Sequence, residues 1–389
     1  MISKSMKTAA NALREGVATT DGSSRVPKFK VILDALRESV ISGEYREGAR
    51  LPSEAELVRR FGVARMTIVK AFKELEQQGL VVRRPGSGTF VAPTGSETRL
   101  FGLLIPELGQ TEIFEPICQG MTQYRSESKV SLLWGNSFIK SDQNEVVARE
   151  LCGEFIRQQV SGVFFAPLEL VPAKDEVNKM VVASLDKARI PVVLLDRCIN
   201  SYPARAEYDL VGIDNRRTAY GATMHLVELG AKRIAFLGKR LSASTVDARI
   251  AGYREALFDS DLHRCENLVT RGDPADETLL RSVLKKHRPD AFLCANDHTA
   301  ATLMKTLIGL GVQIPEGVRV VGIDDVKYAS LLPIPLTTQH QPCQDIGKVA
   351  MATMLERLKS PDLPIREISL NCRLVIRKSC GGSDTDAQL

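Results

Sequence analysis

The sequence predicts an α/β protein in two parts: a small N-terminal unit of helices with a β-hairpin, then a larger two-lobed domain built on doubly wound parallel sheets. Between residues 50 and 91, two short helical patterns separated by Gly62 precede a glycine-rich hairpin. Beyond residue 98, short apolar runs alternate with amphipathic stretches, as expected for parallel strands covered on both faces. About 280 residues of this alternation are too many for one core, so we expect two lobes with a cleft between them.

Composition and charge fit this division. The chain has 389 residues, of which 44% are hydrophobic and 25% charged, as is usual for globular proteins. The net charge of +5 lies in residues 1–98, which contain sixteen Lys or Arg against eleven Asp or Glu; the charges of the remainder cancel. A basic unit on a neutral body favours a nucleic-acid partner. No apolar run approaches the roughly 18 residues of a membrane span and no secretory leader is seen, so we expect a cytoplasmic protein without membrane contact.

Motifs for catalysis and for metal binding are missing from the sequence. Eight cysteines are scattered without C-x-x-C spacing or a His at ligand spacing, so we expect reduced thiols rather than disulfides or a zinc site. No G-x-S-x-G, Walker, G-x-G-x-x-G or H-E-x-x-H motif occurs. We therefore expect no catalytic residues, metal or cofactor. An α/β enzyme acting on a small polyhydroxylated molecule is the alternative from a different class.

The N-terminal unit begins with three helices. Residues 31–40 place apolar side chains at helical spacing. Ser53 and Glu56 have the S-x-x-E spacing of a capping box, which starts a second helix that Gly62 ends in a left-handed turn. A third helix spans residues 65–78 and is closed by Gly79. Its apolar face is Ile68, Ala71, Phe72 and Leu75, and its opposite face is Met66, Lys70, Lys73 and Gln77.

A hairpin completes this unit. Two β-prone runs surround the glycine-rich tip at residues 84–88, which Arg83 and Arg84 precede. A helix-turn-helix with a basic hairpin is a winged helix, and in such folds the N-terminal part of the second helix enters the major groove of DNA. A small helical unit with solvated lysines is the alternative, but four features in the right order argue against it.

The N-terminal unit resembles the GntR-type winged-helix domain over residues 27–92. The resemblance rests on residues 27–30, 48–57, 61–65 and 86–91. It implies DNA contacts by Arg65, by Thr67 and by the backbone of Gly86. Ala64 and Val69 stand where the family usually has Ser and Arg, so the operator sequence cannot be copied from the family. The expected DNA-binding residues are Arg50, Ser53, Arg65, Met66, Thr67, Lys70, Lys73, Arg84 and Gly86.

The rest of the chain alternates strands with helices. Strands are expected at residues 100–105, 130–134, 162–166, 192–195, 233–238, 291–294 and 318–323, and helices at 142–159, 216–229, 248–257 and 298–310. The domains are then a flexible tail (1–26), the winged helix (27–92), a linker (93–98), the two-lobed domain (99–379) and a second flexible tail (380–389).

Polar residues follow several of these strands, where ligands collect in doubly wound sheets. They are Glu107, Asp196 with Arg197, Asn296 with Asp297, and Asp324 with Asp325. Carboxylates and amides accept or donate hydrogen bonds in fixed directions, and an arginine adds a fork of donors. This mixture suits an uncharged, polyhydroxylated ligand. Any one of these residues can equally cap the helix that follows its strand.

The large domain resembles the sensor domain of LacI-type repressors, which is similar in fold to periplasmic sugar-binding proteins. The motifs are residues 214–215, 221–230, 232–236, 249–253, 295–297 and 321–325. The resemblance implies that Asp214 and Asn215 brace a hinge. Phe114 and Trp134 are near positions where the family places rings, although a core role fits both equally. The expected effector-binding residues are Glu107, Phe114, Asp196, Arg249, Asn296, Asp324 and Gln341.

A GntR-type head on a LacI-type body resembles the arabinose repressors. We therefore expect a DNA-binding transcriptional regulator, a repressor that reversible binding of a sugar or sugar derivative controls. The expected partners are double-stranded operator DNA, the small effector and a second copy of the chain in a homodimer. A winged-helix regulator with a smaller, organic-acid-binding body fits poorly, because the strand–helix alternation is too long. Turnover of a sugar would favour the enzyme instead.

Overall fold

The computed structural model describes residues 28–46, 48–77, 80–84, 87–91, 99–105, 112–124, 129–134, 144–205, 207–262 and 268–382. The chain divides into two compact units, Met1–Arg99 with Ser126–Val130 and the remainder, which are described separately as head and body. The predicted tail at 1–26 and the linker at 93–98 lie outside the described residues. The predicted C-terminal tail begins too early, because Cys380 is fully buried, with its Sγ 3.5 Å from Nε2 of His225.

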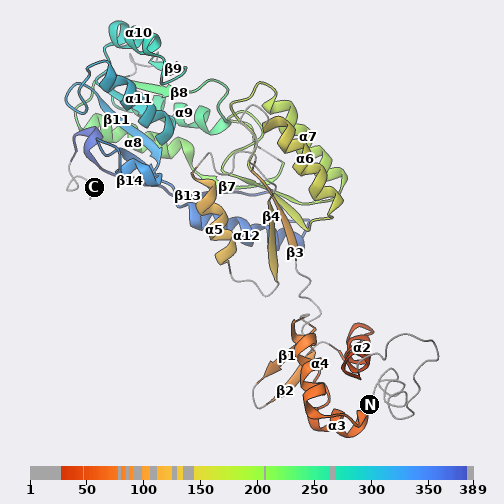
Figure 1. The fold of residues 1–389 in the computed structure, drawn as a ribbon. Coiled ribbons are helices and arrows are strands. Elements are labelled where there is room, and N and C mark those ends of the chain that lie inside the picture. Colours follow the sequence, from red (N-terminus) through yellow and green to blue (C-terminus); the bar gives the residue numbers. More distant parts are fainter. Residues whose placement is uncertain are drawn as a thin grey trace. The chain divides into compact units, whose positions relative to one another are not determined.

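The head has the predicted order of helices and strands (Figure 1). Its elements are α2 (Lys28–Ile41), α3 (Glu54–Phe61), α4 (Arg65–Gln77), β1 (Val81–Arg84) and β2 (Gly88–Val91). The capping box is confirmed: Ser53 Oγ accepts from Glu56 N at 3.3 Å, and Glu56 Oε2 accepts from Ser53 N at 2.7 Å. Gly62 has φ +63 and ends α3 in the left-handed conformation. The predicted closure at Gly79 lies outside the described residues.

Packing confirms the predicted apolar face of α4. Ile68, Ala71, Phe72 and Leu75 are all fully buried. They meet side chains of α2, α3 and both hairpin strands in one core, whose first helix contributes Ile32 and Leu36 among others. The third helix is therefore fixed against the head by one side only, which leaves its other side for a partner.

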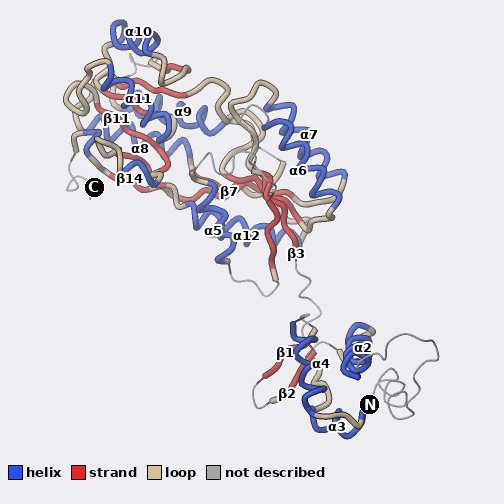
Figure 2. The backbone as a smooth tube through the Cα atoms, viewed as in Figure 1, coloured by secondary structure: helices blue, strands red, loops and turns tan. Residues whose placement is uncertain are grey.

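The body contains two six-stranded sheets, one in each lobe (Figure 2). The first has the order β13 (Glu367–Leu370), β7 (Asp209–Ile213), β6 (Val192–Leu195), β5 (Gly162–Phe165), β3 (Arg99–Leu104) and β4 (Val130–Trp134). The second has the order β14 (Arg373–Val375), β12 (Thr337–His340), β11 (Arg319–Asp324), β10 (Ala291–Cys294), β8 (Ile234–Gly238) and β9 (Val269–Arg271). β12 and β14 pair antiparallel, whereas β5–β6, β6–β7, β8–β10 and β10–β11 pair in parallel.

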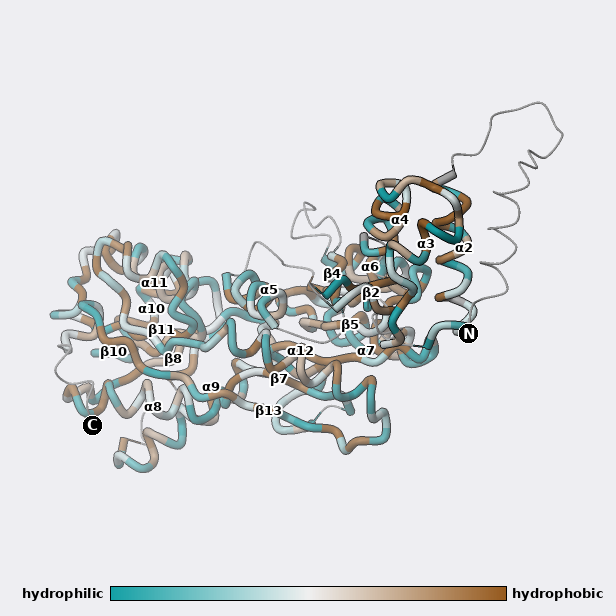
Figure 3. The backbone as a smooth tube through the Cα atoms, turned by 90° about the horizontal axis from the view of Figure 1, so that it is seen from below, coloured by the Kyte–Doolittle hydropathy of each residue, from teal (hydrophilic) through white to brown (hydrophobic). Residues whose placement is uncertain are grey.

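Helices cover both faces of each sheet, as a doubly wound fold requires. In the first lobe they are α5 (Phe114–Gln123), α6 (Asn144–Arg157), α7 (Lys174–Lys187) and α12 (Cys343–Lys359); in the second, α8 (Asn215–Glu228), α9 (Ser244–Asp259), α10 (Glu277–His287) and α11 (Asp297–Gly309). Brown and teal residues alternate along these helices in Figure 3, as expected for helices with one face on a sheet. Two short 3-10 helices, η3 (Lys327–Ser330) and η4 (Lys378–Cys380), complete the second lobe.

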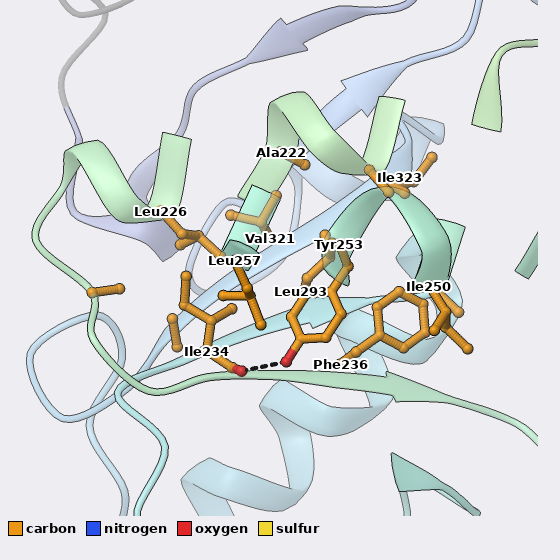
Figure 4. Packing of buried hydrophobic residues seen from close by; sticks show 14 of the residues in the cluster. Ala222, Leu226, Ile234, Phe236, Ile250, Tyr253, Leu257, Leu293, Val321 and Ile323 are labelled. Carbon is orange, nitrogen blue, oxygen red and sulfur yellow. Dashed lines mark hydrogen bonds between the residues drawn. The ribbon is translucent and has the colours of Figure 1, made fainter. Parts of the chain in front are cut away.

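Figure 4 shows the core between α8, α9 and the second sheet. Tyr253 of α9 is fully buried there, and its hydroxyl donates to the carbonyl of Ile234 at 2.7 Å, which satisfies the one polar group of the ring. Gly252, its neighbour, lies against α8 so closely that an added Cβ would clash with the carbonyl oxygen of Arg216. Gly120 on α5 and Gly347 on α12 allow a similar backbone approach in the first lobe.

The chain crosses between the lobes three times: from β7 to α8, from β12 to α12, and from β13 to β14. The predicted strands and helices are confirmed within a few residues, but five strands were missed: β7, β9, β12, β13 and β14. Of these, β9, β12, β13 and β14 are short or carry polar residues, and β13 pairs with β7, which lies far earlier in the sequence. None of the described helices is long and apolar enough to span a membrane.

Candidate functional site

The outer side of α4 presents the predicted DNA-facing residues. The side chain of Arg65 is 78% exposed and Met66 is 74% exposed. Lys70 and Lys73 are exposed further along the helix, while Thr67 is half-buried in its first turn. An exposed, basic helix face above a fixed apolar one is the geometry that a major-groove reader needs.

A single carboxylate links the recognition helix to the hairpin. Glu54 Oε2 accepts from Nε of Arg65 at 3.0 Å, and Glu54 Oε1 accepts from Nη2 of Arg83. The guanidinium of Arg83 also lies 5.9 Å from the ring centroid of Phe72. Neither Glu54 nor Arg83 was expected at the site, although Glu54 lies within the capping-box motif. Glu54 therefore orients the guanidinium groups of both arginines.

Other cations of the head lie over aromatic rings. Lys70 Nζ is 4.4 Å from the centroid of Phe29, and the guanidinium of Arg84 is 4.9 Å from that of Phe90. The guanidinium of Arg50 packs over Gly88, where an added Cβ would come within 2.8 Å of its Nε. Ser53 is occupied as the N-cap of α3, and Gly86 lies outside the described residues.

The body has a cavity of about 750 Å³ between its lobes, at the carboxyl ends of strands from both sheets. Asp196, Arg249, Asn296 and Asp324 all line it, so residues that are far apart in the sequence meet as predicted. Glu107 lies outside the described residues. Arg197, which was expected at a strand end together with Asp196, also lines the cavity. Further lining residues were not expected from the sequence, among them Glu145, Glu169, Lys239, Thr245 and Tyr328.

Arg249 is the centre of a hydrogen-bond network on the second-lobe side. Its Nε donates to Asn215 Oδ1 at 2.8 Å, its Nη1 donates to the carbonyl of Ala295, and its Nη2 lies 3.8 Å from Asp324 Oδ1. Gln341 Nε2 donates to the same Asp324 oxygen at 2.6 Å. Gln341 is buried and is not among the residues that line the cavity, but it contacts Asp324, which does line it. Asn215 lies at the first crossover between the lobes and contacts Arg249 there; its role in bracing a hinge stays a prediction.

Arg197 forms a second cluster on the first-lobe side. Its Nη1 is 2.5 Å from Glu169 Oε1 and its Nε is 3.6 Å from Asp196 Oδ2. Its guanidinium lies 5.3 Å from the ring centroid of Phe114, which is fully buried. Phe114 is therefore not a lining residue, and the prediction of a direct effector contact fails: the ring supports Arg197 from behind. Trp134 is exposed at the end of β4 and does not line the cavity either.

Burial controls the ionisation of the cavity carboxyls. Burial raises the pKa of Asp324 well above its usual value, and Arg249 opposes this shift. Burial also raises the pKa of Asp196, against the effect of Arg197 and Arg249. Desolvation lowers the pKa of His298, which favours its neutral form. Asp196 Oδ1 has no hydrogen-bond partner among the described residues, so it can accept a hydrogen bond from a hydroxyl group of a ligand.

Helix capping explains two of the predicted polar residues. Asn296 Oδ1 accepts from Thr299 N at 2.9 Å as the N-cap of α11, and Asp214 caps α8 in the same way. Asp297 is fully buried and accepts from Thr338 Oγ1 at 2.6 Å, behind the cavity. The carboxyl of Asp297 has its pKa raised to about 6, chiefly by burial.

The head and the cavity together define a DNA-binding regulator with a small-molecule sensor. Residues 29–91 match the model of the gntR family of bacterial regulatory proteins, and residues 223–380 match that of the periplasmic binding protein-like domain. A similar relative is the arabinose metabolism transcriptional repressor of Geobacillus stearothermophilus, 27% identical over 91% of this chain and 98% of the relative. The HTH-type transcriptional repressor PurR of Photobacterium profundum is 27% identical over 72% of this chain and 81% of its own.

Solved structures agree with the body fold. The transcription regulator GntR from Chromobacterium violaceum is 26% identical, covers 73% of this chain and 100% of its own, and has a TM-score of 0.57. CcpA of Lactococcus lactis has a TM-score of 0.62 at 24% identity, over 73% of this chain and 99% of its own. The chain therefore carries a gntR-family DNA-binding domain and a periplasmic binding protein-like sensor domain. It is a ligand-controlled transcriptional repressor and not an enzyme.

Proposed function

We propose that the chain is a cytoplasmic repressor that binds a palindromic operator as a homodimer. It releases the operator when an uncharged sugar binds in the cavity of the body and closes the two lobes around it. The observation that carries the proposal is the joint lining of one interlobe cavity by Asp196, Arg249 and Asp324. Closure of two lobes around a ligand is a hinge motion, and in a dimer it can change the spacing of two DNA heads.

The charges of the cavity support a neutral ligand. Both lining arginines already have carboxylate partners, Arg197 with Glu169 and Arg249 with Asp324. The lining acids are Glu112, Glu145, Glu169, Asp196 and Asp324, against the cations Arg197, Lys239 and Arg249. A phosphate or carboxylate ligand would have to displace the carboxylate partners of the two arginines, whereas hydroxyls can bridge paired carboxylates and guanidinium groups. L-arabinose is the first candidate, from the name of the relative.

A thermal-shift screen of the full chain tests the ligand class. The panel is L-arabinose, other pentoses and hexoses, and their phosphates. A ligand at about 100 times its dissociation constant should stabilise the fold by about 2.7 kcal/mol. Stabilisation by sugar phosphates and not by the free sugars would refute the neutral-ligand proposal.

Operator release is tested with DNA selected from a random pool by the full chain. We expect two inverted half-sites about one or more helical turns apart, because each winged helix reads one half-site. Fluorescence anisotropy should show lower affinity with the stabilising sugar than without it, and tighter binding with the sugar would reverse the direction of control. Light scattering should report a dimer, and Leu331, which is 81% exposed, is an apolar residue that a partner copy could cover.

A further inference from the structure

Glu169 joins the two lobes at the rim of the cavity. It lies in the loop between β5 and α7 of the first lobe. Its Oε2 accepts from the backbone N of Ala243, in the second lobe, at 2.9 Å, and its Oε1 pairs with Arg197 of its own lobe. One carboxylate thus contacts a cavity-lining cation and the backbone of the opposite lobe.

Further hydrogen bonds cross between the two lobes near Glu169. Leu170 N donates to the carbonyl of Leu241 at 2.8 Å, and Ser244 Oγ donates to the carbonyl of Cys198 at 3.2 Å. Leu170 has φ +61 and Leu241 has φ +59, a region that residues with a Cβ rarely adopt. Both strained residues lie at this contact, which indicates that the contact itself holds them there.

The start of α9 depends on Glu169. Ala243 is the N-cap of α9 and has no side chain that can cap it. In a capping box, a glutamate three residues into the helix accepts from the N-cap amide. Here Glu169 supplies this acceptor from the other lobe. Residue 248, the start expected from the sequence, is four residues late, because the capping group of α9 is 74 residues away along the chain.

We propose that Glu169 is a positioning residue of the effector cavity, which stabilises the observed arrangement of the two lobes by holding Arg197 and the first turn of α9 together. Since α9 also carries Arg249, opening at Glu169 separates the two arginines that line the cavity. The link to effector binding rests on the proposed function. The interlobe contact itself can be measured without effector and without DNA.

Hydrogen–deuterium exchange of the full chain, read by mass spectrometry, tests the proposal in the variants Glu169→Ala and Glu169→Gln. We expect peptides containing Ala243 and Leu170 to exchange at least about tenfold faster in Glu169→Ala than in the native chain. The Leu170 amide decides the question, because it bonds to Leu241 and not to Glu169. If Glu169 only capped α9, its removal would speed exchange of the Ala243 amide alone. Faster exchange confined to Ala243 therefore overturns the proposal.

Glu145→Ala is a matched control. Glu145 also lines the cavity and accepts from the N-cap amide of a helix, Ala173 N at 3.2 Å, but both residues belong to the first lobe. In Glu145→Ala, hydrogen exchange should increase around Ala173 and stay unchanged at the amides of Leu170 and Ala243. Glu169→Gln keeps an acceptor for Ala243 but loses the charge facing Arg197, so a smaller increase at both amides is expected. If Glu169→Ala does not fold, native exchange at both amides in Glu169→Gln overturns the proposal.

Discussion

Replacing Arg249 with alanine should destabilise the body by about 3–5 kcal/mol at neutral pH, the usual cost of removing one partner from a buried ion pair. The side chain is only 5% exposed, so its partners lose a donor that water cannot easily replace. The variant leaves Asn215 Oδ1 and the Ala295 carbonyl without this donor. Each unsatisfied group costs about 1–3 kcal/mol, and the buried Asp324 also loses its counter-charge.

Calorimetry of the full chain can measure this loss. For a domain of this size, 3–5 kcal/mol corresponds to a fall of the body's melting temperature by roughly 6–20 °C. Asp324→Asn removes the charge that Arg249 neutralises and keeps an oxygen that can accept from Gln341, so it should cost less. In the double variant of Arg249→Ala with Asp324→Asn, the loss of stability should be smaller than the sum of the two single losses by at least about 1 kcal/mol. Additive losses would refute the view that Arg249 and Asp324 stabilise each other.

The same geometry decides which variant tests effector binding. Arg249→Ala disturbs the hinge through Asn215, so a lost sugar response in that variant would have two explanations. Asp324→Asn leaves the hinge bonds of Arg249 in place. It should lower sugar affinity by an order of magnitude or more and leave operator binding without sugar intact. A normal sugar response of Asp324→Asn would remove this residue from the effector site.

Three further predictions concern other parts of the chain. Glu54→Gln should lower the ratio of operator to random-DNA affinity up to about tenfold, because Arg65 loses its orienting partner; fluorescence anisotropy with an unchanged ratio would contradict this. Gly252→Ala should cost about 1–3 kcal/mol or more through its clash with α8, whereas Gly309→Ala, where an added Cβ meets nothing within 4 Å, should be neutral or stabilising in the same melting assay. Asp297 has its folded-state pKa raised to about 6, so its contribution to stability is complete below about pH 4 and is lost as the pH rises through 6; Asp297→Asn should lack this slope in urea unfolding.

The head was predictable because its signals are local. The capping box at Ser53, the left-handed turn at Gly62 and the apolar spacing of α4 each act within a few residues, and the structure has all three. The contact of Glu54 with Arg65 and Arg83 was not predictable, because it joins residues 11 and 29 positions apart through a turn and a hairpin.

The body was predictable where burial makes a strand uniformly apolar, as in β5, β6 and β10. Strands such as β13, with alternating partial exposure, take their structure from a distant partner and gave no such signal. The expectation that ligand-binding residues follow the ends of strands selected Asp196, Asn296 and Asp324. It could not show that Asp324 faces Arg249, or that Phe114 lies behind Arg197. Glu169 follows β5 and the same rule, applied to every strand, would have selected it.

The first lobe of the body is completed only by segments near the end of the chain. β13 pairs with β7 in register from Glu367 to Leu370, and α12 packs on α5 across the close contact at Gly120 and Gly347. During synthesis on the ribosome, the first sheet therefore lacks an outer strand and a covering helix until about residue 370 has emerged. A nascent chain halted in the second lobe would expose the apolar faces of β6, β7 and α5, a target for chaperones and proteases. Quality control of this regulator thus depends on its last crossovers, long after the DNA-binding head has been made.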